Sequence, residues 1–312
     1  MDVLSDAVTA MRTGKPHSGR VHRPAPFGMW NPLVAGAGFH IVLQGPCWLF
    51  PPDGVPIALG VGDVAFLPHG AAHGLADSPS TPLVDAATSP AEIPPGQDDN
   101  VPPTGQTDGS ADATVMLCGA YLLDRSRTHP LLDDLPEVIH LPARVGRHPG
   151  LHAAVNLLGC EVEQPRPGGD AMLAALLDVL LLHILRAWFD EQSAHAATGW
   201  AAALRDPAVA AGLRAIHNDP GRQWTVAELA SLAGLSRAAF ARRFAALVGQ
   251  PPQAYLTWWR MTAARRLLRD GDAPLATVAR KVGYTSEFAF AHAFKREYGL
   301  APGGFRRSAR RT

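Results

Sequence analysis

The feature that most constrains this 312-residue chain is a repeat near its end. Residues 226–244 and 275–294 share a pattern of small, apolar and aromatic residues about fifty positions apart, and each copy is followed by a Gly-x-x-Pro sequence. Gly234 of the first copy corresponds to Gly283 of the second. Two short helices joined at a tight glycine turn form a helix-turn-helix, which lays its second helix in the major groove of DNA. The repeat therefore predicts two DNA-reading units on one chain.

The distribution of charge agrees with a nucleic-acid partner. The whole chain is neutral, with 28 basic and 28 acidic residues. Residues 205–312 hold 18 Lys and Arg against 7 Asp and Glu, whereas residues 1–204 hold 10 against 21. Most of these basic residues are arginine, whose planar guanidinium makes paired hydrogen bonds to phosphate and guanine. A single arginine is readily explained as a solvated surface residue, but a segregated basic half favours a polyanion as partner.

Composition argues against a secreted or membrane protein. The apolar content of 47% is enough for the cores of two domains. We find no apolar run of about 18 residues, so neither a membrane span nor a secretion signal is expected. The three cysteines, Cys47, Cys118 and Cys160, form no Cys-x-x-Cys pair. This usage is typical of a cytoplasmic protein without a disulfide framework.

The order of patterns along the chain predicts an α+β protein. Short apolar runs between residues 38 and 67, and another at 114–123, indicate the strands of a small β-barrel or sandwich. Residues 77–112 are rich in Pro, Asp, Ser and Thr, so we expect a mobile loop there. The pattern becomes helical at residues 151–163 and 170–192.

Helix start and stop signals are clear in the basic half, where about seven helices are expected. Thr225 with Glu228 predicts a capping box, and Ser236 and Gly249 predict the two ends of the first recognition helix. The remaining signals are Pro251-Pro252 at the start of a long helix through Leu268, a break at Gly271-Asp272, Pro274 at the next helix start, and Thr285 or Ser286 as the cap of the second recognition helix.

Helical spacing indicates which side chains of the first recognition helix face DNA. Phe240 and Phe244 lie four positions apart and should face the core. The outer positions are then Arg237, Ala238, Ala241 and Arg242. Arg242 is the best candidate for base recognition, because the guanidinium matches O6 and N7 of guanine. Arg237 and Arg243 are expected to bind phosphates, which position the protein without reading sequence.

The second recognition helix has a different outer face. Phe290 and Phe294 take the core positions, which leaves four residues outside, Glu287, Phe288, Ala291 and His292. Glu287 is suited to accept a hydrogen bond from the amino group of cytosine, and Phe288 to touch a thymine methyl. Lys295 and Arg296 are candidate phosphate contacts. For each of these side chains the alternative is an ordinary solvated or packing role.

The double motif, its connecting helix and the ending at residues 299–306 resemble the AraC/XylS family of bacterial transcription regulators over about residues 207–307. The resemblance implies that the two recognition helices of a domain at 205–308 enter successive major-groove segments on one face of promoter operator DNA. It also implies an N-terminal domain that senses a signal or dimerises, with RNA polymerase as a further partner. Ala238 and Ala241 are smaller than the residues common in the family, and His292 stands where arginine is common.

Residues 62–73 have the spacing G-x5-P-x-G-x2-H, which resembles the second motif of the cupins. In that motif the final histidine, here His73, is a metal ligand inside a β-barrel. The first cupin motif normally supplies two His and a Glu, and this chain lacks that arrangement. Strand alternation places His40 inward, so His40 and His73, with His69, are candidate ligands of one divalent metal. The alternative is that they are neutral, hydrogen-bonded core residues.

The N-terminal half also resembles a cupin subgroup of AraC-type regulators, which includes an activator that responds to reactive chlorine through cysteine oxidation. The resemblance makes Cys118, before Gly119, a candidate redox residue, with Cys47 beside Trp48 as a weaker one. No cysteine lies near residues 19–22 to act as its partner, so a disulfide switch is not implied. A thiol in an apolar strand is usually inert, which makes a core role for Cys118 the alternative.

These patterns predict a cupin-like sensor at residues 1–145, a helical region at 146–200 and the DNA-binding domain. A leucine-rich face in the middle region, Leu173 to Trp188, is expected to form a homodimer or to dock the DNA-binding domain. The alternative is an ordinary core helix that packs within the chain. The leading hypothesis is a one-component transcription regulator without enzymatic activity or an assured cofactor. The alternatives are a cupin metalloenzyme, such as an isomerase or dioxygenase, with an appended DNA-binding domain, and an architectural DNA binder without an effector.

Overall fold

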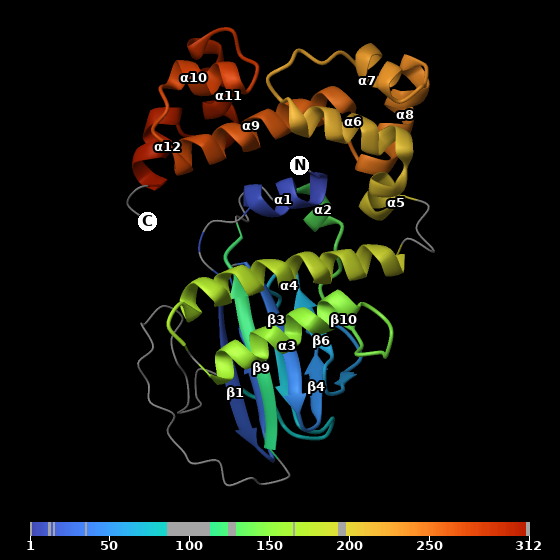
Figure 1. The fold of residues 1–312 in the computed structure, drawn as a ribbon, viewed down its shortest axis with the longest axis vertical. Coiled ribbons are helices and arrows are strands. Elements are labelled where there is room, and N and C mark those ends of the chain that lie inside the picture. The colour runs from blue at the N-terminus through green and yellow to red at the C-terminus, as the bar shows by residue number, and fades with distance from the viewer. Residues whose placement is uncertain are drawn as a thin grey trace. The chain divides into compact units, whose positions relative to one another are not determined.

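The computed structural model divides into two compact units, which we call the β unit and the helical unit (Figure 1). The β unit comprises residues 12–128 and 135–189, and the helical unit comprises residues 1–11, 129–134 and 190–312. The structure describes residues 2–11, 14, 16–34, 36–85, 113–123, 129–164, 166–192 and 198–309.

The β unit contains two five-stranded sheets. In order across the first sheet the strands are β1 (His17–Pro24), β9 (Ala113–Tyr121), β3 (Ala37–Gln44), β6 (Val64–Leu67) and β10 (Ile139–Leu141). Across the second they are β5 (Ile57–Leu59), β4 (Cys47–Phe50), β7 (His73–Ala76), β2 (Gly28–Asn31) and β8 (Val84–Asp85). The predicted strands are therefore present, but among the described residues the two sheets do not close into a barrel, so the sandwich alternative is the correct one.

The core of the β unit lies between the two sheets. Val42 and Met116 of the first sheet pack in one buried cluster with Leu49 and Leu75 of the second. The first six residues of β3 are buried without alternation, since helices cover the other face of its sheet (Figure 1). The hydroxyl of Tyr121 on β9 donates to the carbonyl oxygen of Leu177 at 2.8 Å, which ties this face to α4 (Gly169–Gln192).

The two helices of the β unit are α3 (Pro149–Glu163) and α4 (Gly169–Gln192), close to the ranges expected from the sequence. The predicted leucine-rich face of α4 is largely buried, from Leu176 to Leu185. This burial matches packing within the chain, while Leu157, Met172 and Val179 remain exposed. Within the described residues, α4 is the one helix with the length and hydropathy of a membrane span, and 44% of that window is buried inside the structure. One such helix is weak evidence for a membrane span.

The expected mobile loop at residues 77–112 is partly ordered. Residues 77–85 are described and end in β8, which pairs in parallel with β2 through Met29–Val84 and Trp30–Asp85. Main-chain pairing to a neighbouring strand gave structure to a segment whose composition alone suggested none. The rest of the predicted loop, residues 86–112, lies outside the described residues.

The helical unit contains the two predicted helix-turn-helix (HTH) units near the two ends of a long helix, α9 (Pro252–Asp270) (Figure 1). The first HTH unit is α7 (Val226–Leu232) and α8 (Arg237–Val248), and the second is α10 (Leu275–Lys281) and α11 (Glu287–Tyr298). The other described helices are α1 (Val3–Met11), α2 (Pro130–Asp133), α5 (Gly199–Arg205), α6 (Pro207–Asn218) and α12 (Pro302–Ala309).

The predicted helix ends are confirmed by their capping bonds. Thr225 and Glu228 form the capping box at the start of α7, and Ser236 caps α8. Ser286, rather than Thr285, caps α11. Gly249 ends α8 in the left-handed conformation, with φ of 83°, which a residue without Cβ adopts at low cost.

Two early segments of the chain belong to the helical unit, which the sequence patterns did not predict. α1 and the segment 129–134 both cluster with residues 190–312. Asp6 of α1 contacts His217 at the end of α6, and His129 lies 3.2 Å from the Tyr255 hydroxyl of α9. Helices α6 and α9 of the helical unit are therefore packed against segments from the N-terminal half of the sequence.

Candidate DNA interface and β-unit polar cluster

The first recognition helix, α8, is oriented by its two phenylalanines. Phe240 and Phe244 are fully buried, and their rings lie 5.6 Å apart between centroids. Because residues four apart share one face of a helix, this pair turns the opposite face outward. Arg237, Ala238 and Arg242 are exposed there and Ala241 is half-buried, as the spacing predicted.

Arg243 has a partner that the sequence analysis missed. Its Nε donates to Oδ2 of Asp206 at 2.6 Å, and a terminal nitrogen of the same guanidinium contacts that oxygen as well. The other carboxylate oxygen of Asp206 caps α6, where it accepts from the amides of Ala208 and Val209. In this structure Arg243 joins α8 to the start of α6, so its guanidinium is not directed to a phosphate alone.

The second recognition helix, α11, repeats the same local design with different outer residues. Phe290 and Phe294 are fully buried, while Glu287, His292, Lys295 and Arg296 are exposed and Ala291 is half-buried. The side chain of Phe288 is 82% exposed, the most exposed phenylalanine of the described chain. Its ring therefore lies on the outer face of α11, as the helical spacing predicted.

A shallow hollow runs along the outer face of α11. It is lined by Tyr284, Phe288, Ala289, His292, Ala293 and Arg296. Phe288, His292 and Arg296 are spaced four apart and form a continuous stripe.

The corresponding stripe on α8 carries much smaller side chains. When the two helices are aligned in sequence on their buried phenylalanines, Phe288, His292 and Arg296 correspond to Ala238, Arg242 and Ala246. The two helices thus offer unlike surfaces: one arginine between two alanines on α8, and a continuous aromatic and basic stripe on α11. A pair of such surfaces suits a DNA site whose two halves differ in sequence.

The β unit holds a second cluster of interest around His40. The Nε2 atom of His40 lies 2.7 Å from Nε2 of His73, and its Nδ1 lies 3.1 Å from Sγ of Cys118. The pairing of β3 with β9 sets His40 opposite Cys118, a register that could not be read from the sequence. The structure thereby joins two of the three predicted metal candidates, His40 and His73, to the redox candidate Cys118 in one cluster.

The direction of these hydrogen bonds follows from one carbonyl. Nδ1 of His73 lies 2.8 Å from the carbonyl oxygen of Ala71, which can only accept, so Nδ1 carries the proton. Nε2 of His73 then accepts from Nε2 of His40, and Nδ1 of His40 accepts from the Cys118 thiol. Burial lowers the pKa of both histidines, that of His40 well below its usual value, so both rings are neutral.

The geometry does not fit a metal ion held by these residues. Two ligands of a tetrahedral zinc ion lie about 3.3 Å apart, whereas the two facing nitrogens of His40 and His73 are 2.7 Å apart. His69 does not join them, because its Nε2 bonds to the carbonyl oxygen of Leu135 at 2.9 Å. The described residues contain no group of three His, Cys, Asp or Glu side chains able to hold a metal.

The thiols of Cys47 and Cys118 are held in their protonated form. Burial raises the pKa of Cys118 to about 12, and it does the same for Cys47. Cys47 is buried beside Met116, with 3.6 Å between the sulfur atoms. Since the thiolate is the reactive form, neither cysteine is activated in this state.

Comparison with known proteins identifies both halves of the chain. A family model described as a cupin matches residues 2–190, and one described as a helix-turn-helix domain matches residues 229–308. An AraC-like transcription regulator of Streptomyces lividans is 36% identical over 98% of both chains. The chain belongs to the AraC-like transcription regulators. This AraC-like protein is also similar to the RCS-specific HTH-type transcriptional activator RclR of Escherichia coli strain K12, with 28% identity over 98% of both chains.

A solved structure also resembles part of this AraC-like chain. The DNA-binding domain of the transcriptional factor AdpA, in complex with a target DNA, is 33% identical over 34% of this chain and 95% of that one, with a TM-score of 0.32. The resemblance to AraC-type regulators with a cupin-like N-terminal half, expected from the sequence motifs, is confirmed by the family matches and the relatives.

Proposed function

We propose that this AraC-like regulator binds one operator with both recognition helices, which enter successive major-groove segments on one face of double-stranded DNA. The observation that carries the proposal is the pairing, within one unit, of two capped helices whose buried phenylalanines turn their opposite faces outward. On α8, Arg242 is assigned to guanine and Arg237 to a phosphate. On α11, Phe288, Glu287 and His292 face the bases, and Lys295 and Arg296 bind phosphates or the groove edge.

Footprinting of the full chain on a selected operator tests this assignment. Protection should cover two adjacent major-groove turns with centres about 10 bp apart. Arg242→Ala and Phe288→Ala should each weaken contacts in one of the two turns, which identifies the half-site that each helix occupies. Protection of a single turn, unchanged by one of these substitutions, would contradict binding by both helices. Equal affinity for specific and random DNA at physiological salt would instead indicate an architectural binder.

The β unit is proposed to sense the signal rather than to catalyse a reaction. Its buried polar cluster consists of neutral side chains already bonded to one another, with no arrangement that favours a metal-bound water or a thiolate. This favours a small molecule over a metal or an oxidant as the signal. Metal analysis of the purified chain, together with thiol titration before and after mild oxidant, separates the three. A stoichiometric metal that is lost in His73→Ala would overturn the assignment and revive the metalloenzyme alternative.

We further propose that the regulator works in the cytoplasm as a homodimer that contacts RNA polymerase as an activator. Exposed apolar side chains on α3 and α4 support a dimer, with Leu157 58% and Met172 51% exposed. Sedimentation of the wild-type chain and of the Leu157→Glu/Met172→Glu double variant tests it. A wild-type chain that sediments as a monomer at micromolar concentration would contradict the dimer. In-vitro transcription with and without the chain distinguishes activation from repression.

A further inference from the structure

The loop between α6 and α7, residues 219–225, reaches from the first HTH unit to the second. The side-chain amide of Gln223 donates to the carbonyl oxygen of Gly283 at 2.6 Å. Gly283 is the glycine of the second helix-turn-helix turn and has a φ of 81°. At Gly221 the loop backbone also passes close to the end of α10, since a Cβ there would lie 3.0 Å from the carbonyl oxygen of Lys281. The loop that leads into the first HTH unit therefore contacts the second HTH unit at the turn that sets the direction of α11.

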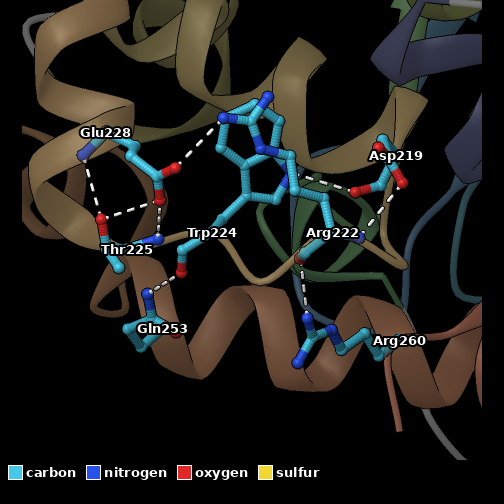
Figure 2. A network of polar contacts seen from close by, with 7 residues as sticks. All are labelled: Asp219, Arg222, Trp224, Thr225, Glu228, Gln253 and Arg260. Atoms are coloured by element: carbon cyan, nitrogen blue, oxygen red, sulfur yellow. Dashed lines mark hydrogen bonds and ion pairs between the residues drawn. The ribbon is translucent and has the colours of Figure 1, made fainter. Parts of the chain in front are cut away.

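Side chains of α9 hold this loop by its backbone, as Figure 2 shows. Arg260 donates from Nε to the carbonyl oxygen of Pro220 and from Nη2 to that of Arg222, both at 2.8 Å. About two turns earlier on α9, Gln253 donates to the carbonyl oxygen of Trp224 at 2.6 Å. Loop carbonyls are acceptors that would otherwise need water, so these bonds fix the loop on the helix that joins the two HTH units.

Arg260 also touches the second HTH unit. A Cβ placed on Gly283 would lie 2.6 Å from the Nη2 atom of Arg260, so the guanidinium packs directly against this turn. Gly283 is thus held from two sides, by the close approach of Arg260 and by the hydrogen bond from Gln223. Glycine is favoured here by its positive φ and because a Cβ would lie 2.8 Å from the backbone carbonyl oxygen of Gly221.

The other end of the loop is fixed to the first HTH unit. The backbone amide of Thr225 donates to Glu228, while the amide of Glu228 donates back to the Thr225 hydroxyl (Figure 2). Arg222 donates to the same carboxylate at 3.1 Å and lies 4.0 Å above the Trp224 ring. An unbroken series of bonds therefore runs from the start of α7, through the loop, to the turn before α11.

We propose that Gln223 and Arg260 are positioning residues that fix the separation of the two recognition helices, so that the regulator selects operators by the spacing of their half-sites. The inference rests on the proposed function, in which both helices bind one DNA. A rigid pair of helices fits a second half-site at one distance and one rotation along the groove. DNA with another spacing has to be twisted or bent to fit, and that deformation weakens binding.

Binding to a spacing series tests the proposal. Fluorescence anisotropy gives Kd for an operator with its natural spacing and for operators with one or two base pairs inserted or removed between the half-sites. The wild-type chain is expected to lose about tenfold or more in affinity when the spacing changes by one base pair. The ratio of Kd at the altered spacing to Kd at the natural spacing measures this loss. Gln223→Ala and Arg260→Ala are expected to reduce the ratio to about threefold or less, because the second HTH unit is then free to adjust. The ratio is measured within one variant, so a reduced active fraction leaves it unchanged.

Gln253→Ala is the matched control. It removes a hydrogen bond from α9 to the same loop, but Gln253 bonds Trp224 and has no bond to the Gly283 turn. This variant should keep the wild-type spacing ratio even if its affinity falls for every operator. Because Gln223 is exposed, its truncation leaves the core intact, which keeps the test independent of Arg260.

The outcomes separate this inference from the proposed function. If Gln223→Ala and Arg260→Ala retain the wild-type ratio while footprints cover both half-sites, the positioning role is wrong and two-helix binding stands. If the wild-type footprint covers one half-site and affinity is insensitive to spacing, two-helix binding itself fails. A ratio that falls equally in Gln253→Ala would mean that general loosening of the loop, rather than the link to Gly283, sets the spacing.

Discussion

The Nδ1 atom of His217 lies 3.2 Å from Oδ2 of Asp6, a residue 211 positions earlier in the chain. The Nε2 atom of His217 lies 2.7 Å from the hydroxyl of Tyr255, which in turn lies 3.2 Å from Nε2 of His129. The backbone amide of Leu131 donates to Nδ1 of His129, so the proton of that ring sits on Nε2. His129 then donates to Tyr255, Tyr255 to His217, and His217 to the carboxylate of Asp6.

The two histidines of this series make the stability of the helical unit depend on pH. Burial lowers the pKa of His129 well below its usual value, and it lowers that of His217 although the Asp6 carboxylate opposes the shift. The unfolded chain therefore takes up protons as pH falls below about 6.5, while the two histidines of the folded unit take them up only at lower pH. Full stability is expected above that pH, with a loss of up to about 1.4 kcal/mol per histidine for each pH unit below it.

Urea unfolding followed by tryptophan fluorescence at pH 7.5, 6.5 and 5.5 measures this dependence. His217→Gln keeps a side chain that can hydrogen-bond but does not titrate, so its stability should change less steeply between pH 6.5 and 5.5. A wild-type slope equal to that of His217→Gln would show that His217 is protonated in the folded unit.

The Tyr255 hydroxyl is expected to contribute strongly to stability, because it is hydrogen-bonded to two buried histidines, His129 and His217. Tyr255→Phe leaves a donor on His129 and an acceptor on His217 buried without their partner, which should cost about 1–3 kcal/mol in the free energy of unfolding. Tyr284→Phe changes a half-buried tyrosine near the second HTH unit and serves as the control. Equal losses in the two variants would mean that the buried series adds little to stability.

Arg242 and Arg237 should differ in what they contribute to binding. Arg242→Ala is expected to weaken binding to the cognate operator by about 1–3 kcal/mol and to relax selection at one base pair, since it removes a guanine contact. Arg237→Ala is expected to weaken binding to all sequences and to reduce the salt dependence by about one phosphate contact. Selection of operators from a randomised library at two salt concentrations measures both effects. An equal loss of affinity for all operator sequences in Arg242→Ala would show that Arg242 contacts a phosphate.

The ion pair between Arg243 and Asp206 predicts an effect on folding rather than on DNA affinity. Asp206→Ala removes this pair and the cap of α6 and should cost about 1–2 kcal/mol of stability. Arg243→Ala should cost less, because about half of its side chain is exposed (53%) and its pair is screened by solvent. The salt dependence of DNA binding should be unchanged in Arg243→Ala. A decrease in that salt dependence would restore the phosphate contact expected from the sequence.

Local signals allowed the helical unit to be predicted in more detail than the β unit. Phenylalanine pairs four apart, the Thr225–Glu228 box and the glycine helix ends depend on residues within one turn of each other, so they can be read directly. The contacts of His217 with Asp6 and of His40 with Cys118 join residues far apart in the chain. They depend on strand register and on how distant helices pack, which a single sequence does not contain. The ion pair of Arg243 with Asp206 was missed for the same reason, because its partner lies 37 positions away.

The three cysteines should react at very different rates. Cys160 is exposed on α3, whereas Cys47 is buried and the thiol of Cys118 is bonded to His40. With a pKa of about 12, Cys118 and Cys47 are almost entirely protonated at pH 8, so they should react with an aromatic disulfide reagent only slowly. The native chain should therefore show one fast thiol, and the urea-unfolded chain three. Cys160→Ser should abolish the fast phase while leaving the unfolded count at two. A second fast phase that disappears in Cys118→Ala would show instead that the bond to His40 opens readily, and that the β unit exposes this thiol to oxidants.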